Sequence, residues 1–145
     1  MMRCLLCLAI GIALGAAGLA LAQPTPKEKA AGSAKFQPVL EQELKDKLND
    51  KQGKIVVLEL VSAPGSASRP HRHPGPVVGY VLDGELEVAV DDGPVKVYKK
   101  GEAWFEPGRA LHRVNRNPSK TKPARFLAFM LMTTDDKHLV LPAKE

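Results

Sequence analysis

The sequence predicts an all-β protein, a small jelly-roll barrel of about seven or eight short strands. Short apolar runs, many of them β-branched, recur along the chain after its first third. Glycine- and proline-containing turns separate these runs at close and nearly even intervals, which is typical of a sandwich or barrel. The chain has 145 residues, which is enough for one domain of ordinary size.

The N-terminal segment predicts export from the cell. Arg3 supplies a positive charge, residues 4–22 are apolar and end in Ala-Leu-Ala, and this pattern indicates a signal peptide over residues 1–22. The alternative is an uncleaved membrane anchor. Cleavage would give a secreted or periplasmic protein with no membrane partner. Because Cys4 and Cys7 both lie in this segment, the mature chain would contain no disulfide and no cysteine ligand.

Residues 23–35 have no apolar periodicity and predict a flexible linker, which leaves residues 36–145 for the barrel domain. The start of that domain allows two interpretations. The Pro38-Val39-Leu40 sequence favours a strand over residues 38–44. Leucines at positions 40, 44 and 48 recur every four residues and favour a short amphipathic helix over residues 40–48.

The rest of the chain alternates between strand and turn patterns. Asp83-Gly84 predicts a two-residue β-hairpin, and the next run places Leu86, Val88 and Val90 on one face. We expect an apolar barrel interior that includes Val77, Gly79, Val81, Leu86, Val88 and either Phe126 or Met130. The expected strands cover residues 54–63, 77–82, 85–90, 95–98, 103–105, 111–115, 124–132 and, as a short last strand, 139–141.

Three of the four histidines form a candidate metal site. His71 and His73 are two residues apart, so in an extended chain their side chains point to the same side, and His112 begins a later strand. Three neutral imidazoles suit Fe, Mn, Zn or Ni as a divalent ion. The alternative is a set of loop histidines that bond to backbone groups. His138, in the polar tail, is expected at the surface.

Two spaced motifs resemble those of the cupin family. The first runs from Gly65 through S-A-S-R-P to His71-Arg72-His73 and on to Gly84. The second runs from Gly101 through E-A-W-F-E to Pro107-Gly108 and on to His112, with Asn115 shortly after. The resemblance covers nearly all of residues 54–132 and implies a jelly-roll barrel that holds a metal at its mouth. It assigns His71, His73 and His112 to the family's three histidine positions.

The chain departs from the cupin pattern at three positions. Val77 stands where the family has a glutamate ligand, Arg109 replaces a glycine, and Asn115 comes one residue early. Three histidines alone would leave the ion its full charge and an extra open position, so a Val77→Glu change is expected to strengthen metal binding. No Asp or Glu is expected inside the barrel as a general base. Tyr80 and Arg109 are the nearest polar candidates, although strand parity points Tyr80 outward.

The sequence therefore predicts an exported single-domain cupin that binds a divalent metal and a small molecule. Its activity would be that of a metal-dependent dioxygenase or related oxidoreductase, because the resemblance extends to cupin-like thiol dioxygenases with three histidines. The alternatives are a non-catalytic module that binds a metal or small ligand, and a metal-free barrel. The net charge of +5 is spread among acidic residues, which argues against nucleic acid as a partner. The resemblance also implies a homodimer joined at sheet edges.

Overall fold

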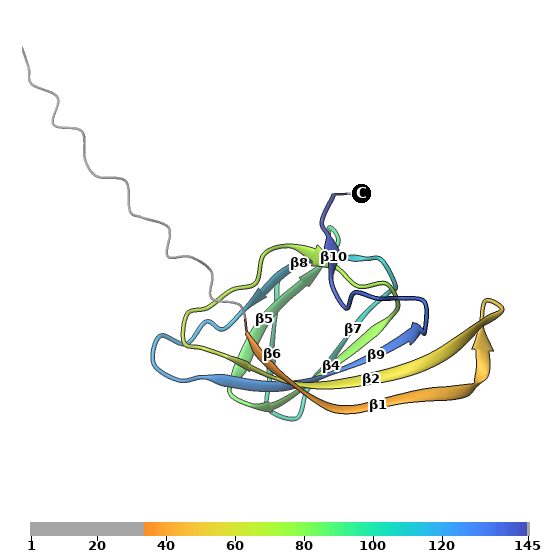
Figure 1. Ribbon diagram of the computed structural model, residues 1–145. Coiled ribbons are helices and arrows are strands. Elements are labelled where there is room, and N and C mark those ends of the chain that lie inside the picture. The colour runs from red at the N-terminus through yellow and green to blue at the C-terminus, as the bar shows by residue number, and fades with distance from the viewer. Residues whose placement is uncertain (1–33, 145) are drawn as a thin grey trace, which may run out of the picture.

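The computed structural model describes residues 34–144 (Figure 1). The predicted signal peptide and residues 23–33 of the predicted linker lie outside this range. Lys35 is the first residue of the first strand, one residue before the predicted start of the barrel domain. Between residues 34 and 144, no helix is both long and apolar enough to cross a membrane.

Two five-stranded antiparallel sheets make up the fold and confirm the all-β jelly-roll prediction. The first sheet has the order β1-β2-β9-β4-β7, and the second has the order β10-β3-β8-β5-β6. The strands are β1 (Lys35–Leu48), β2 (Lys51–Ser62), β3 (His71–Arg72), β4 (Val77–Asp83), β5 (Glu85–Val90), β6 (Lys96–Lys99), β7 (Ala103–Glu106), β8 (Leu111–Arg116), β9 (Ala124–Thr133) and β10 (Leu141–Pro142).

The first strand settles the choice between strand and helix, and the helical alternative is wrong. Residues 35–48 pair with β2 as a long antiparallel hairpin that extends beyond the barrel in Figure 1. Asn49 and Asp50 form its two-residue turn, with φ angles of 50° and 60°. Positive φ angles at both turn residues are characteristic of a type I′ turn, whose twist matches that of the two antiparallel strands. Pairing with β2 provides hydrogen-bond partners along one edge of β1, and this tertiary context overrides the four-residue leucine spacing.

The hairpin predicted at Asp83-Gly84 is also wrong. Strand β4 pairs with β7 and β9, whereas β5 pairs with β6 and β8 in the other sheet. The chain turns a corner between the sheets here, and Gly84 has a φ of 75°. Gly84 supplies a left-handed backbone conformation, which a corner between sheets can use as well as a hairpin turn. Local turn chemistry therefore could not distinguish a hairpin from a corner.

The core lies between the two sheets and matches the predicted interior. Val81 and Leu86 are fully buried, and Val77, Val88, Phe126 and Met130 are at most 4% exposed. The missing side chain of Gly79 makes room for Trp104, since a Cβ at residue 79 would lie 2.1 Å from that ring. This glycine therefore allows the Trp104 indole to pack closely against β4, and the indole lines the same cavity as the three histidines.

Candidate metal centre

The three predicted histidines come together at one end of the barrel. His71 begins β3 and lies directly opposite His112 on β8, while His73 follows immediately after β3. One nitrogen from each ring falls within 4.8 Å of the others. His73 and His112 are buried and His71 is half-buried. The extended backbone around residue 72 keeps the first two rings on one side, and strand pairing brings in the third.

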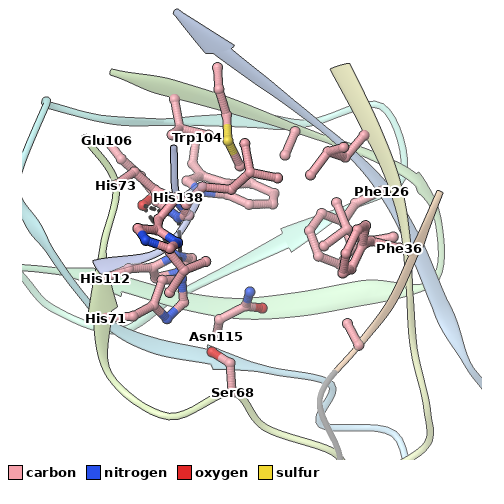
Figure 2. Close-up of a pocket in the computed structure, with 18 of the residues that line it drawn as sticks. Phe36, Ser68, His71, His73, Trp104, Glu106, His112, Asn115, Phe126 and His138 are labelled. Carbon is pink, nitrogen blue, oxygen red and sulfur yellow. Dashed lines mark hydrogen bonds and ion pairs between the residues drawn. The ribbon is translucent and has the colours of Figure 1, made fainter. Parts of the chain in front are cut away.

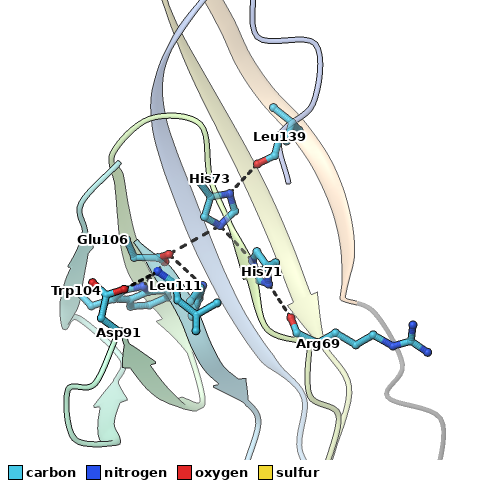
Figure 3. A network of polar contacts seen from close by, with 9 residues as sticks. Arg69, His71, His73, Asp91, Trp104, Glu106, Leu111 and Leu139 are labelled. Carbon is cyan, nitrogen blue, oxygen red and sulfur yellow. Dashed lines mark hydrogen bonds and ion pairs between the residues drawn. The ribbon is translucent and has the colours of Figure 1, made fainter. Parts of the chain in front are cut away.

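Backbone carbonyls fix the tautomers of two of these rings (Figure 3). His71 Nδ1 lies 2.8 Å from the carbonyl oxygen of Arg69, and His73 Nδ1 lies 2.7 Å from that of Leu139. A carbonyl oxygen can only accept, so each Nδ1 must donate its hydrogen. The neutral rings therefore present a lone pair at Nε2. The alternative prediction, histidines that bond to backbone groups, is therefore confirmed for the Nδ1 atoms of these two rings. Because these bonds use only Nδ1, the Nε2 atoms stay available as metal ligands.

The two Nε2 atoms face each other across 3.2 Å. Because the hydrogens are on Nδ1, neither Nε2 atom can donate to the other. Two lone pairs held this close repel each other unless a cation or a proton lies between them. Both nitrogens of His112 are also buried without a hydrogen-bond partner among the described residues. The donor set therefore fits a divalent metal ion, for which neutral imidazole nitrogens are common ligands.

A buried carboxylate, Glu106, lies against the histidines and corrects the expectation of an interior without Asp or Glu. It ends β7 and is 2% exposed. One oxygen, Oε1, accepts a hydrogen bond of 2.8 Å from Trp104 Nε1. The other, Oε2, lies 3.1 Å from His112 Nδ1 and 3.8 Å from His73 Nε2. The sequence did contain a signal for this position. Glu106 is two residues from Trp104, and alternate residues of a strand share a face, so a buried Trp104 predicts a buried Glu106.

The surroundings shift the pKa values of these groups in ways that favour metal binding. Burial lowers the pKa of His71 and of His73 below 6.5, and the neighbouring histidines lower it further. Burial alone would raise the pKa of Glu106, but contact with His112 and the hydrogen bond from Trp104 hold it below its usual range. Neutral imidazoles and an ionised carboxylate are the forms that bind metals.

A cavity of about 500 Å³ opens beside the cluster, within the usual size range for a small-molecule site. Figure 2 shows the three histidines and Glu106 at one side and Phe36 and Phe126 at the other. Leu58, Leu60, Ala128 and Met130 add to its apolar wall. The cavity thus has one polar end, at the candidate metal centre, and a mainly apolar body.

The other polar candidates, Tyr80, His138 and Arg109, are not part of the group of three histidines that could hold a metal. Tyr80 is 39% exposed, as strand parity predicts. His138 is at the surface as expected, but it also lines the cavity. Arg109 is exposed and stands where the cupin motif has a glycine. Its φ of 63° lies in the left-handed region, which residues other than glycine rarely adopt. Its backbone N–H bonds the carbonyl of His73 at 2.9 Å and so steadies that histidine.

The histidine pKa shifts predict that the metal-free protein loses stability on acidification. The unfolded chain takes up protons near pH 6.5, whereas the folded chain resists protonation at His71 and His73 to lower pH. Stability from these two groups is therefore present above pH 6.5 and is lost as the pH falls through their lowered pKa values. Glu106 adds a loss of the same sign below 4.5.

Urea denaturation in the presence of a chelator, at several pH values between about 7 and 5, measures this effect. A His71→Gln/His73→Gln variant should show a flatter dependence, and His138→Gln should behave as the wild type. Stability that rises on acidification in this range would contradict the assignment.

Comparisons with known proteins agree with this architecture. The family model described as Cupin domain matches residues 58–130, half of the chain. A Neurospora crassa protein named cupin-domain-containing oxidoreductase srdB is 35% identical over 83 residues, 57% of this chain and 40% of that protein. Oryzines biosynthesis cluster protein J of Aspergillus oryzae is 33% identical over 93 residues, 64% of this chain and 49% of that protein.

The match to these curated relatives therefore spans less than half of their length. Among solved structures, a Klebsiella pneumoniae protein with a double-stranded beta-helix domain has a TM-score of 0.53 and 21% identity, over 84% of both chains. That likeness shows the fold. The paired sheets, the two histidine motifs and the match over residues 58–130 lead to one conclusion: this chain belongs to the cupin domain family.

Proposed function

We propose that this protein binds one divalent metal ion through His71, His73 and His112 and acts as an oxidoreductase on a small, mainly apolar molecule. The observation that carries the metal site is the pair of Nε2 lone pairs facing each other across 3.2 Å. The Neurospora crassa relative named an oxidoreductase supports the activity. Fe, Mn, Zn and Ni all suit the imidazole donors, and Fe or Mn would supply redox chemistry.

The protein's own groups prepare the metal site. Arg69 and Leu139 carbonyls orient two rings through their Nδ1 hydrogens, as outer partners of metal-bound histidines do. The Leu139 contact also ties the segment after β9 to the site. That segment contributes Leu139 and Val140 to the cavity lining, so it helps to exclude water from the polar end. A drier site strengthens electrostatic attraction between ligands and metal.

The cavity indicates the class of small molecule. A ligand would place an oxygen-bearing group at the histidine end and an apolar body against Phe126, Ala128 and Met130. Burial of that body supplies a favourable free energy of about 25 cal/mol per Å² of apolar surface. The second candidate function is a non-catalytic binding module, because the same cavity would hold such a molecule without any reaction.

The metal site is tested by titrating Mn(II), Fe(II) or Zn(II) into metal-free full-length protein that carries no histidine tag. The wild type should bind one ion, and His71→Ala or His112→Ala should weaken binding by about 100-fold or more, since each removes a direct ligand. His138→Ala is the matched control and should bind as the wild type does. A wild type that binds no ion, or histidine variants that bind as tightly as it does, would contradict the proposal.

The sole tryptophan, Trp104, reports on the cavity that it lines. Medium-chain carboxylates such as octanoate should change its fluorescence, and at lower concentration in the metal-loaded protein than in the metal-free one. Oxygen uptake by the iron-loaded protein in the presence of a bound molecule would favour the oxidoreductase. Binding across a wide panel of such molecules without turnover would favour the non-catalytic module.

A further inference from the structure

The carboxylate that the first cupin motif lacks reappears on the neighbouring strand. Val77, at the expected glutamate position, pairs directly with Glu106 across the β4–β7 ladder. Directly opposite residues in an antiparallel pair project from the same face of the sheet, about 5 Å apart. Both side chains line the same cavity, and each is 2% exposed. The interior therefore contains a carboxylate one strand away from its expected place.

The two oxygens of Glu106 are in different situations. Trp104 holds Oε1 through a hydrogen bond of 2.8 Å and so fixes the direction of the carboxyl group. Oε2 is buried and accepts no hydrogen bond within residues 34–144. An ionised oxygen without a partner is costly to bury, so a buried carboxylate normally pairs with a cation or coordinates a metal. Oε2 faces the histidines, where such a cation would lie (Figure 3).

The contact between Glu106 and His112 has the spacing of two ligands. Oε2 lies 3.1 Å from Nδ1 of His112, yet neither atom has a hydrogen bond of normal geometry. Ligands about 2.1 Å from one ion lie about 3.0 Å apart at right angles and about 4.2 Å apart when opposite. The separations of 3.1 Å here, 3.8 Å from Oε2 to His73 Nε2 and 3.2 Å between the two Nε2 atoms fall within that interval, whereas the nitrogens of the three histidines lie up to 4.8 Å apart, slightly beyond it.

We propose that Glu106 is the fourth protein ligand of the metal and takes the place of the carboxylate missing at Val77. This inference rests on the proposed metal site. It gives the site one negative charge, so a divalent ion keeps a net charge of one instead of two. It also bears on the expectation that Val77→Glu alone strengthens metal binding. That change would set two carboxylates directly opposite each other, so moving the carboxylate is a better test than adding one.

The test moves the carboxylate back across the ladder. Mn(II) affinity is measured by electron paramagnetic resonance for wild type, Glu106→Gln, Val77→Glu/Glu106→Gln and Val78→Glu/Glu106→Gln. Glu106→Gln should weaken binding at least 10-fold, and Val77→Glu should restore most of it. Val78 is 42% exposed on the opposite face, so a glutamate there should restore nothing. Circular dichroism checks that each variant is folded.

Co(II) absorption separates direct binding from an indirect effect through His112. Loss of a ligand in Glu106→Gln should change the number of ligands and hence the visible spectrum. Weaker binding with an unchanged spectrum would make Glu106 a positioning residue and overturn the inference, as would wild-type affinity in Glu106→Gln. If Glu106→Gln does not fold, Glu106→Asp is used in its place. Its shorter side chain keeps the negative charge but moves the carboxylate oxygens away from the metal, so it should give the same weakening of binding and the same spectral change.

The histidine variants distinguish this inference from the proposed function. Tight binding by wild type, loss in His71→Ala and no change in Glu106→Gln would leave the three-histidine site intact and reject only the fourth ligand. A wild type that binds no divalent ion would reject both.

Discussion

Replacing Trp104 with alanine is expected to lower the free energy of unfolding by about 3–5 kcal/mol. The indole is 5% exposed, and its ring centre lies 5.6 Å from that of Tyr98 and 5.8 Å from that of Phe126. Truncation removes this aromatic packing, leaves a cavity against Gly79, and deprives Glu106 of its hydrogen bond. Urea denaturation of the metal-free protein measures the loss.

Phe105 offers a matched control on the same strand. It is 60% exposed because alternate residues of β7 face outward, so Phe105→Ala should change stability by no more than about 0.5 kcal/mol. Trp104→Phe keeps most of the packing and removes only the N–H donor to Glu106, so its cost should be intermediate. Equal losses for Trp104→Ala and Phe105→Ala would mean that β7 presents its other face to the core.

Replacing Asn117 with alanine is expected to cost about 3 kcal/mol, a large effect for a polar residue. Asn117 is 1% exposed, and its amide nitrogen donates to the carbonyl oxygens of Ser62, Ala63 and Lys122. Its side-chain oxygen accepts from the backbone N–H of Ser119 at 3.0 Å. These bonds join the end of β2 to the loop before β9. Alanine would leave buried backbone groups without partners, and thermal or urea denaturation measures the cost.

Two further variants test the reason for that cost. Asn115→Ala changes a half-buried asparagine two positions earlier and should cost much less. Asn117→Asp keeps the acceptor for Ser119 but removes the donors and brings a charge near three carbonyl oxygens, so it should be at least as damaging as alanine. Wild-type stability in Asn117→Asp would show that the donated bonds contribute little.

Most of the strands and the histidine triad could be predicted from the sequence, because each rests on a local pattern. Alternation along residues 85–90 is enough to place Leu86 and Val88 inside, and both are buried. The i, i+2 spacing of His71 and His73 puts their rings on one side of the chain. The second cupin motif, which follows the first in the expected order, identifies His112 as the third histidine. Chain pairing was less predictable, since Asp83-Gly84 supports an inter-sheet corner as readily as a hairpin. The Asn49-Asp50 hairpin was not predicted, because the sequence left a strand over residues 38–44 and a helix over residues 40–48 both open.

The position of Glu106 beside the histidines could not be predicted from such local patterns. The sequence by itself determined the fold class, the inner faces of the strands and the three imidazoles of the candidate site, because side-chain alternation and turn chemistry act between near neighbours. Only the tertiary structure decided that Glu106 lies opposite Val77 and against His112. These residues lie on β7, β4 and β8, and their distances depend on strand order and register. Those are set by packing of the whole core, which no short segment encodes.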